Sequence, residues 1–129
     1  MRHFGEVSSD GPSDQRDFSK LTIRKASVGA MANNVYLLTC RHTGKQLLID
    51  AADDAGRIRS LLDEGAGGLD VIVTTHQHWD HHRALIEVKQ STGAATAAGD
   101  SDADALPVIP TLRLAQGDTL TFGDITLDV

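Results

Sequence analysis

The feature that most constrains the fold of this chain is a cluster of metal-binding side chains between residues 76 and 82. Four of the six histidines and one aspartate occupy these seven consecutive positions, as His76, His78, Asp80, His81 and His82. Imidazole and carboxylate groups are preferred ligands of zinc and other borderline divalent cations. The cluster directly follows the apolar run 71–74. This run fits a strand that is covered on both faces. The cluster therefore predicts a metal site just after the end of that strand.

The spacing within the cluster predicts two neighbouring ions. His76 and His78 are two residues apart, so on an extended backbone they point the same way and can bind one ion. Asp80 and His81 are adjacent, and a helix that begins near them can direct both toward a second ion. Two ions roughly 3.5 to 4 Å apart can share a water, lower its pKa and present hydroxide to a carbonyl or phosphoryl centre. The pattern thus indicates hydrolysis.

A structural zinc site is the alternative for the cluster, and the remaining histidines and the single cysteine are interpreted as ordinary residues. A purely structural zinc site is disfavoured, because the chain has no second cluster and no cysteine pair to complete a tetrahedron. His82 is interpreted as a surface residue at a helix N-terminus. His3 and His42 are interpreted as ordinary surface or core residues. Cys40 ends an apolar run and is interpreted as a buried structural thiol.

Composition narrows the class of protein and its partners. The chain of 129 residues has the size of one domain, with 40% hydrophobic and 23% charged residues. Its net charge of -6 and scattered basic residues argue against nucleic acid or an anionic membrane as the main partner. A small-molecule substrate is expected instead. No stretch approaches the ~20 apolar residues of a membrane span, and no apolar signal segment is seen, so a cytoplasmic location is expected.

Hydrophobic periodicity predicts an α/β or α+β layer structure with a mixed sheet. Residues 1–18 are interpreted as a mobile polar arm and residues 19–129 as one domain. Two aspartates, Asp53 and Asp54, offer a helix N-cap, and Gly65 ends that helix. A second helical pattern runs from Ala84 to Gly93. The expected strands are 21–28, 35–38, 46–49, 71–74 and 94–98, followed by a hairpin that turns at Gly123 and Asp124.

The cluster and its flanking segments resemble a known superfamily. Residues 75–81, which read Thr-His-Gln-His-Trp-Asp-His, match the T-H-x-H-x-D-H signature of the metallo-β-lactamase-fold hydrolases. Residues 34–38 and 48–50 look like the opening strands of that superfamily. Residues 116–123 are similar to a stretch of its glyoxalase II-like branch. The resemblance runs from about residue 21 to residue 129.

The resemblance implies roles for individual residues. His76 and His78 would bind the first metal ion, and Asp80 and His81 the second. Asp80 would also orient the attacking water. The ions would be Zn²⁺, although iron and manganese fit the same ligands. In the family Asp50 lies beneath the site and helps to hold the metal-binding loop; the alternative is a strand-end aspartate that caps the loop after it.

The resemblance also implies an αββα sandwich, of which this chain supplies about the first half and the start of the second. Such an incomplete sandwich would expose an apolar sheet face through which the chain could associate. The family's third first-site histidine, its bridging aspartate and its final histidine lie downstream of this part in the family, and none of them is present in this sequence. The family also has small residues after the Asp-His pair, whereas this chain has His82, Arg83 and Ala84, which are expected to alter the wall of the site.

Three functions are therefore considered. The favoured one is a metal-dependent hydrolase of a thioester, lactone or related ester, impaired or inactive as this chain alone. The alternative is a non-catalytic half-domain that binds metal or associates with a complementary half. A nucleic-acid-processing member of the superfamily is disfavoured by the acidic charge and the absence of a basic groove.

Overall fold

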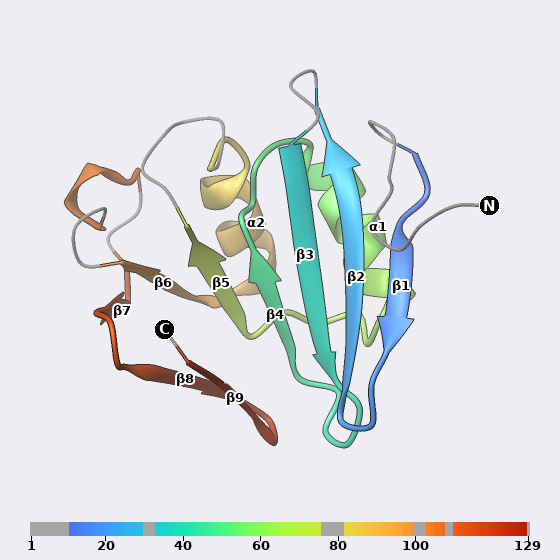
Figure 1. Ribbon diagram of the computed structural model, residues 1–129. Coiled ribbons are helices and arrows are strands. Elements are labelled where there is room, and N and C mark those ends of the chain that lie inside the picture. The colour runs from blue at the N-terminus through green and yellow to red at the C-terminus, as the bar shows by residue number, and fades with distance from the viewer. Residues whose placement is uncertain (1–10, 30–32, 76–81, 100–102, 108–109, 129) are drawn as a thin grey trace.

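The chain folds around one seven-stranded mixed sheet with strand order β1-β2-β3-β4-β5-β6-β7 (Figure 1). The computed structural model describes residues 11–29, 33–75, 82–99, 103–107 and 110–128. The strands of this sheet are β1 (Asp14–Asp17), β2 (Leu21–Val28), β3 (Asn33–Cys40), β4 (Gln46–Ile49), β5 (Val71–Thr74), β6 (Ala95–Gly99) and β7 (Leu112–Leu114). The remaining elements are α1 (Ala55–Glu64), α2 (Leu85–Thr92), a short 3₁₀ turn η2 (Ala103–Ala105), and the strands β8 (Thr119–Phe122) and β9 (Ile125–Asp128).

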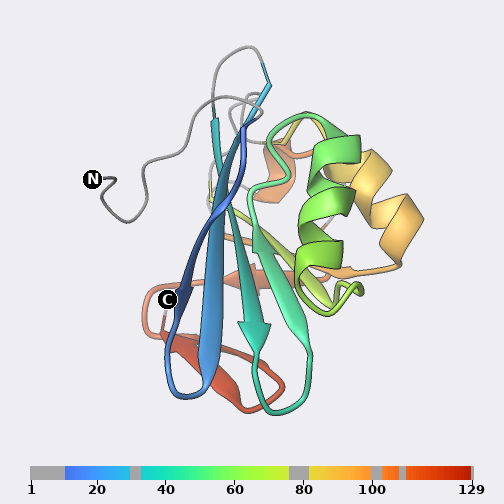
Figure 2. The same cartoon turned by 90° about the vertical axis from the view of Figure 1, so that its right-hand side faces the viewer.

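The sheet changes from antiparallel to parallel at β4. Strands β1 to β4 pair antiparallel through short turns, whereas β4, β5, β6 and β7 run parallel. The helices α1 and α2 form the two crossovers between β4, β5 and β6. Both helices lie on the same face of the sheet, as Figure 2 shows. This follows from the fixed hand of such crossovers, because successive strands are added in one direction.

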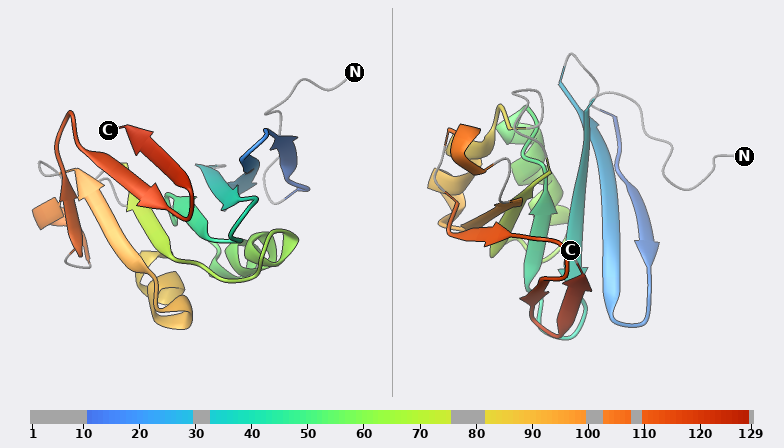
Figure 3. Two further views of the ribbon diagram at one scale, coloured as in Figure 1. Left: turned by 90° about the horizontal axis from the view of Figure 1, so that it is seen from below. Right: turned by 60° about the vertical axis from the view of Figure 1, so that its left-hand side comes forward.

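The sheet is covered by two different layers, which Figure 3 shows from below. On one face the helices bury an apolar cluster that includes Leu37, Leu48, Ile58, Leu61 and Ile72. On the other face the β8–β9 hairpin, which forms a separate two-stranded sheet, packs Leu120, Phe122 and Ile125 against the strands. Ile23, Tyr36, Ile49 and Val73 on this second face are only partly buried. The hairpin thus covers only part of the apolar face opposite the helices.

The ends of α1 are set by the residues that the sequence predicts. The Asp54 carboxylate accepts a hydrogen bond from the Arg57 amide at 3.1 Å and caps the helix N-terminus. Gly65 follows the last helical residue, and its amide donates to the Leu62 carbonyl. The fully buried Gln46 side chain then ties this end to β4, because its amide donates to the carbonyls of Leu62 and Gly68.

Two strands lie where the sequence predicts none. Strand β1 falls within residues 1–18, the expected polar arm, and pairs with β2 through all four of its residues. Strand β7 pairs with β6 and lies between the predicted strand 94–98 and the predicted hairpin. Both are edge strands: β1 has no apolar side chain, whereas β7 has an exposed leucine, Leu112, and a partly buried one, Leu114. Strand β1 therefore has no alternating hydrophobic pattern, and the alternation in β7 is only three residues long, which is too short to indicate a strand. Within the described residues, no helix is long and apolar enough to cross a membrane.

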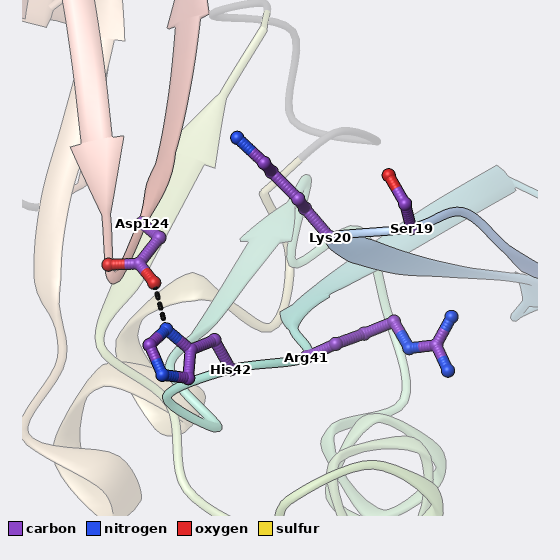
Figure 4. Close-up of a pocket in the computed structure, with 5 residues that line it drawn as sticks. All are labelled: Ser19, Lys20, Arg41, His42 and Asp124. Atoms are coloured by element: carbon purple, nitrogen blue, oxygen red, sulfur yellow. Dashed lines mark hydrogen bonds and ion pairs between the residues drawn. The ribbon is translucent and has the colours of Figure 1, made fainter.

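The turn of the β8–β9 hairpin docks on the turn between β3 and β4. The His42 ring nitrogen Nδ1 pairs with the Asp124 carboxylate (Figure 4). The Asp124 amide donates to the Sγ atom of Cys40 at 3.4 Å. Gly123 has a φ of +57°, and a Cβ there would lie 2.2 Å from the Thr43 hydroxyl oxygen. The close approach of the two turns therefore requires glycine at position 123.

The hydrogen bonds between these turns shift two titrating groups. The Asp124 carboxylate raises the pKa of His42, first through the hydrogen bond and second through its charge. The Thr43 hydroxyl and the Asp124 amide lower the pKa of the Cys40 thiol to about 7. The Cys40 side chain is buried, as the sequence predicts. The cations of Lys20 and Arg41 line the same surface cavity as His42.

We expect the docking of the hairpin turn to weaken as the pH rises. Because the folded-state pKa of His42 lies above its ordinary 6.5, the stabilisation is complete below that value and is lost as the pH rises through the raised pKa. The thermal midpoints of the unchanged chain and of His42→Gln should differ most below pH 6.5 and should converge as the pH rises through the raised pKa. The comparison is repeated in a Cys40→Ser background, because the thiol titrates in the same range. A difference independent of pH would contradict this account.

Candidate metal centre

The candidate centre lies at the end of the sheet where the parallel strands β4 and β5 finish. The four predicted ligands, His76, His78, Asp80 and His81, lie outside the described residues. Their flanking residues, Thr75 and His82, are described. Ligands commonly gather at the carboxyl ends of strands in open α/β sheets. Residues 76–81, which contain the four predicted ligands, are called the ligand segment. The described residues on either side of it show what the fold contributes to the site.

Asp50 fixes the first end of the ligand segment. Its Oδ1 accepts a hydrogen bond from the Thr75 amide at 2.7 Å, and its Oδ2 accepts one from the Thr75 hydroxyl at 2.6 Å. Asp50 is buried, and its φ of 63° lies in the left-handed region that aspartate tolerates better than most residues. Both oxygens thus contact the residue directly before His76. This contact favours the interpretation that Asp50 supports the metal-binding segment over the interpretation that it only caps its own loop.

The pairing of β4 with β5 places Asp50 beside Thr75. The parallel register aligns Leu48 with Ile72 and Ile49 with Val73. One step further, the Asp50 amide donates to the Val73 carbonyl at 2.8 Å. The carboxylate of Asp50 then reaches the next amide of the neighbouring chain. The pairing of two apolar strands therefore places the two hydrogen bonds between Asp50 and Thr75, called the clamp below, at the end that the strands share.

The second end of the ligand segment is held by the same loop. The Arg83 amide donates to the Ala52 carbonyl at 3.0 Å, and the Ala84 amide donates to the Ala51 carbonyl at 2.9 Å. His82 lies in the turn that leads into α2, where its carbonyl accepts from the Leu85 amide. These backbone contacts could not be found from sequence, because they join positions about thirty residues apart without a motif.

Two cavities border the β8–β9 hairpin, one beside its turn and one beside its strands. One of about 340 Å³ is lined by Ile49, Val73, Thr75 and Leu127 among others, and so adjoins the start of the ligand segment. The other, of about 560 Å³, is lined by Ser19, Lys20, Arg41, His42 and Asp124. Figure 4 shows that its Arg41 side chain points away from His42. The first cavity is the one placed to serve a metal centre beyond β5.

The donor set fits a divalent metal ion. Three imidazoles and one carboxylate are available within residues 76–81, and they match the ligand preferences of zinc. Carboxylate support of the surrounding segment, which Asp50 supplies, is the usual companion of such ligands. Among the described residues, no group of three or more His, Cys, Asp or Glu side chains could hold a metal ion. The ligand segment 76–81 is therefore the metal candidate that remains.

Comparison with known sequences finds a matching family model and several similar proteins. Residues 28–120 match the sequence model of the metallo-beta-lactamase superfamily. A hydroxyacylglutathione hydrolase of Ruegeria pomeroyi is 32% identical over 97 residues, which cover 75% of this chain and 37% of that protein. A hydroxyacylglutathione hydrolase of Cereibacter sphaeroides is 35% identical over 91 residues, which cover 70% of this chain and 35% of that protein. The chain thus spans little more than a third of the length of these relatives.

Comparison with solved structures gives the same fold. A metallo-beta-lactamase from Staphylococcus aureus superposes with a TM-score of 0.71 at 21% sequence identity. The superposition covers 85% of this chain and 33% of that structure. At this identity the likeness concerns the fold. It confirms the predicted α/β class and the predicted metallo-β-lactamase-like architecture, of which this chain covers a part.

We expect Asp50→Asn to weaken metal binding more than it weakens the fold. An asparagine cannot accept both hydrogen bonds from Thr75 in the same way, and loss of a carboxylate that supports metal ligands costs about 10- to 100-fold in affinity. The measurement is Zn²⁺ affinity by competition with a chromophoric chelator. Asp70→Asn is the matched control, because the Asp70 carboxylate accepts a hydrogen bond from the backbone amide of Gln46 at the opposite end of β5. Equal losses in both variants would show that Asp50 has no special role.

Proposed function

The chain belongs to the metallo-beta-lactamase superfamily, and we propose that it carries the first half of a metal-dependent hydrolytic centre. The observation that carries the proposal is the clamp between Asp50 and Thr75, which lies directly before the ligand segment at the end of β5. The reaction is hydrolysis of a thioester, lactone or related ester. The hydroxyacylglutathione hydrolases among its relatives support the thioester as the first substrate class to test.

In this proposal the residues of the ligand segment have distinct roles. His76 and His78 hold one ion, and Asp80 and His81 hold a second. Zn²⁺ is the first choice for both, with iron or manganese as alternatives. When bound, the metal supplies Lewis acidity and lowers the pKa of water toward neutrality. Asp80 accepts a hydrogen bond from the attacking water and orients it toward the substrate carbonyl. Asp50 keeps the start of the segment in place through Thr75.

The number of ligands limits what this chain does alone. A catalytic zinc normally has three protein ligands together with water. The two histidines proposed for the first ion fall one short of that number. We therefore propose that the 129-residue chain binds metal weakly and turns substrate over slowly by itself.

A second candidate function is association with a complementary protein half without catalysis. The specific observation that favours it is the partly covered sheet face, where Ile23, Tyr36 and Ile49 remain partly buried. The cavity of about 340 Å³ between this face and the hairpin has mainly apolar walls, formed by Leu47, Val73, Leu114 and Leu120 with others. A partner that supplies apolar side chains there would complete the layer.

Removal of the first pair of ligands should abolish binding of the first metal ion. We expect His76→Ala/His78→Ala to hold less zinc than the unchanged chain after equilibrium dialysis of both against the same Zn²⁺ solution, because no other pair of imidazoles is proposed for that ion. The measurement is elemental analysis of the purified chains. His82→Ala is the matched control, since it removes a neighbouring histidine outside the proposed ligand set. Unchanged zinc content in the double variant would refute the metal assignment.

Hydrolysis should be slow, dependent on metal and dependent on Asp80. We expect weak release of product from acyl-glutathione and lactone substrates in the presence of Zn²⁺, lost in Asp80→Ala and lost on chelation. Release of free thiol or of acid is followed spectroscopically against a blank without protein. Brisk turnover that Asp80→Ala abolishes would show that the chain has a complete centre, against the proposed shortage of ligands. Turnover unaffected by chelation would contradict the metal mechanism.

A further inference from the structure

The loop between β4 and α1 contacts both ends of the ligand segment. Asp50 in this loop holds Thr75, and the carbonyls of Ala51 and Ala52 accept the amides of Ala84 and Arg83. The loop is therefore the shared support of the segment. Its first end has a side-chain clamp in Asp50. The side chains at its second end decide whether a comparable clamp exists there.

A charged pair joins the loop to the second end. The Arg83 guanidinium Nη1 lies 3.1 Å from Oδ2 of Asp53, and the two side chains are only 26% and 31% exposed. Two other ion pairs of the described residues are more open to solvent: Arg59 with Glu87 at 3.6 Å, and Arg113 with Asp104 at 2.9 Å. Partial burial strengthens such a pair relative to one on the open surface, because water screens it less.

The Asp53 carboxylate is held from two further sides. Its Oδ1 accepts a hydrogen bond from the Asp54 amide at 2.9 Å, directly before α1. Gly29, at the end of β2, packs against the same carboxylate with a φ of +73°. A Cβ at position 29 would lie 2.2 Å from Oδ2 of Asp53, so only glycine leaves room for the carboxylate. The acceptor of Arg83 is thus fixed by the helix start and by the neighbouring strand.

The position of Arg83 is also where this chain departs from the residue types expected after the Asp-His pair. Small residues are expected there, and arginine was expected to alter the wall of the site. The structure directs the guanidinium of Arg83 to the Asp53 carboxylate. The expectation about the wall of the site concerns residues outside those described, and it stays a prediction. The long side chain of Arg83 is therefore held by a specific partner, the Asp53 carboxylate.

We propose that Asp53 and Arg83 are positioning residues that hold the second end of the ligand segment, as Asp50 and Thr75 hold the first. The inference rests on the proposed function, because it assumes that residues 76–81 bind the metal. Asp53 and Arg83 touch neither ion nor substrate in this account. They act by fixing the backbone at residue 83, two positions after the last ligand, His81. Their loss should therefore affect metal affinity more than global stability.

The test uses the full 129-residue chain and Zn²⁺ or Co²⁺ alone. Asp53→Asn and Arg83→Gln each remove one charge of the pair, and Arg83→Lys keeps the charge. Asp104→Asn is the matched control, since Asp104 forms a comparable but exposed pair with Arg113. Three quantities are measured: the Zn²⁺ dissociation constant by competition with a chromophoric chelator, the visible absorption of the Co²⁺-loaded chain, and the thermal midpoint of the metal-free chain.

We expect Asp53→Asn and Arg83→Gln to weaken Zn²⁺ binding by about tenfold, the lower end of what residues supporting a metal site contribute. The Co²⁺ absorption should change in both variants, because the ligands shift relative to the ion. Arg83→Lys should recover part of the affinity, and Asp104→Asn should retain all of it. The thermal midpoints of the metal-free Asp53→Asn and Asp104→Asn chains should move by similar small amounts, as partly exposed ion pairs contribute little to stability.

Two results would overturn the inference. One is an unchanged Zn²⁺ affinity and Co²⁺ spectrum in both Asp53→Asn and Arg83→Gln. The other is a loss of affinity that accompanies unfolding of the metal-free chain, with no recovery in Arg83→Lys. His76→Ala/His78→Ala separates this failure from that of the proposed function. If that double variant binds Zn²⁺ as the unchanged chain does, the metal assignment fails; if it loses Zn²⁺ while Asp53→Asn does not, only the positioning role fails.

Discussion

The parallel pairing of β4 with β5 is the contact on which the remaining structure depends. It aligns Ile49 with Val73, and this alignment brings the next residue of one strand, Asp50, beside Thr75 of the other. A shift of one residue would exchange the side chains of β5 between the face covered by the helices and the face covered by the hairpin, and it would separate the two polar residues. The same pairing requires a crossover helix, α1, whose first turn lies beside the loop that supports the ligand segment. Packing of the core and placement of the site are thus consequences of one register.

The two ends of the sheet have different tasks. At one end the turns after β3 and β8 meet through His42, Gly123 and Asp124 and hold the hairpin on the sheet. At the other end the loop after β4 holds the flanks of the ligand segment. Polar contacts at the first end join layers of the fold, whereas those at the second end join neighbouring backbone segments. This division separates the residues that stabilise the domain from those that arrange the proposed chemistry.

Much of the fold could be predicted from the sequence, because local signals and the tertiary structure agree there. Asp54 and Gly65 end α1 as capping chemistry predicts, and the strand 46–49 is bounded as its apolar run indicates. The edge strands β1 and β7 could not be predicted, since β1 has no apolar residue and the three residues of β7 are too few to reveal a period of two.

The candidate site divides in a similar way. Asp50 could be identified because it follows an apolar strand and matches a family pattern. The pair of Asp53 with Arg83 could not, because a salt bridge between residues thirty positions apart depends on where two loops come to lie. The ligands His76, His78, Asp80 and His81 remain predictions from their spacing and from the resemblance.

The anchoring of both flanks of the ligand segment has a consequence for how the domain relates to its metal. Closing a loop costs conformational entropy, and here protein hydrogen bonds at Thr75 and Arg83 offset that cost. In a zinc finger the ion itself closes the loop, so that binding free energy is folding free energy. In this domain protein hydrogen bonds hold both flanks of the segment, so we expect folding and metal binding to be separable if residues 76–81 bind the ion as proposed. Ligand residues in such a loop can be exchanged during evolution without loss of the scaffold, which allows one architecture to acquire different metals and different reactions.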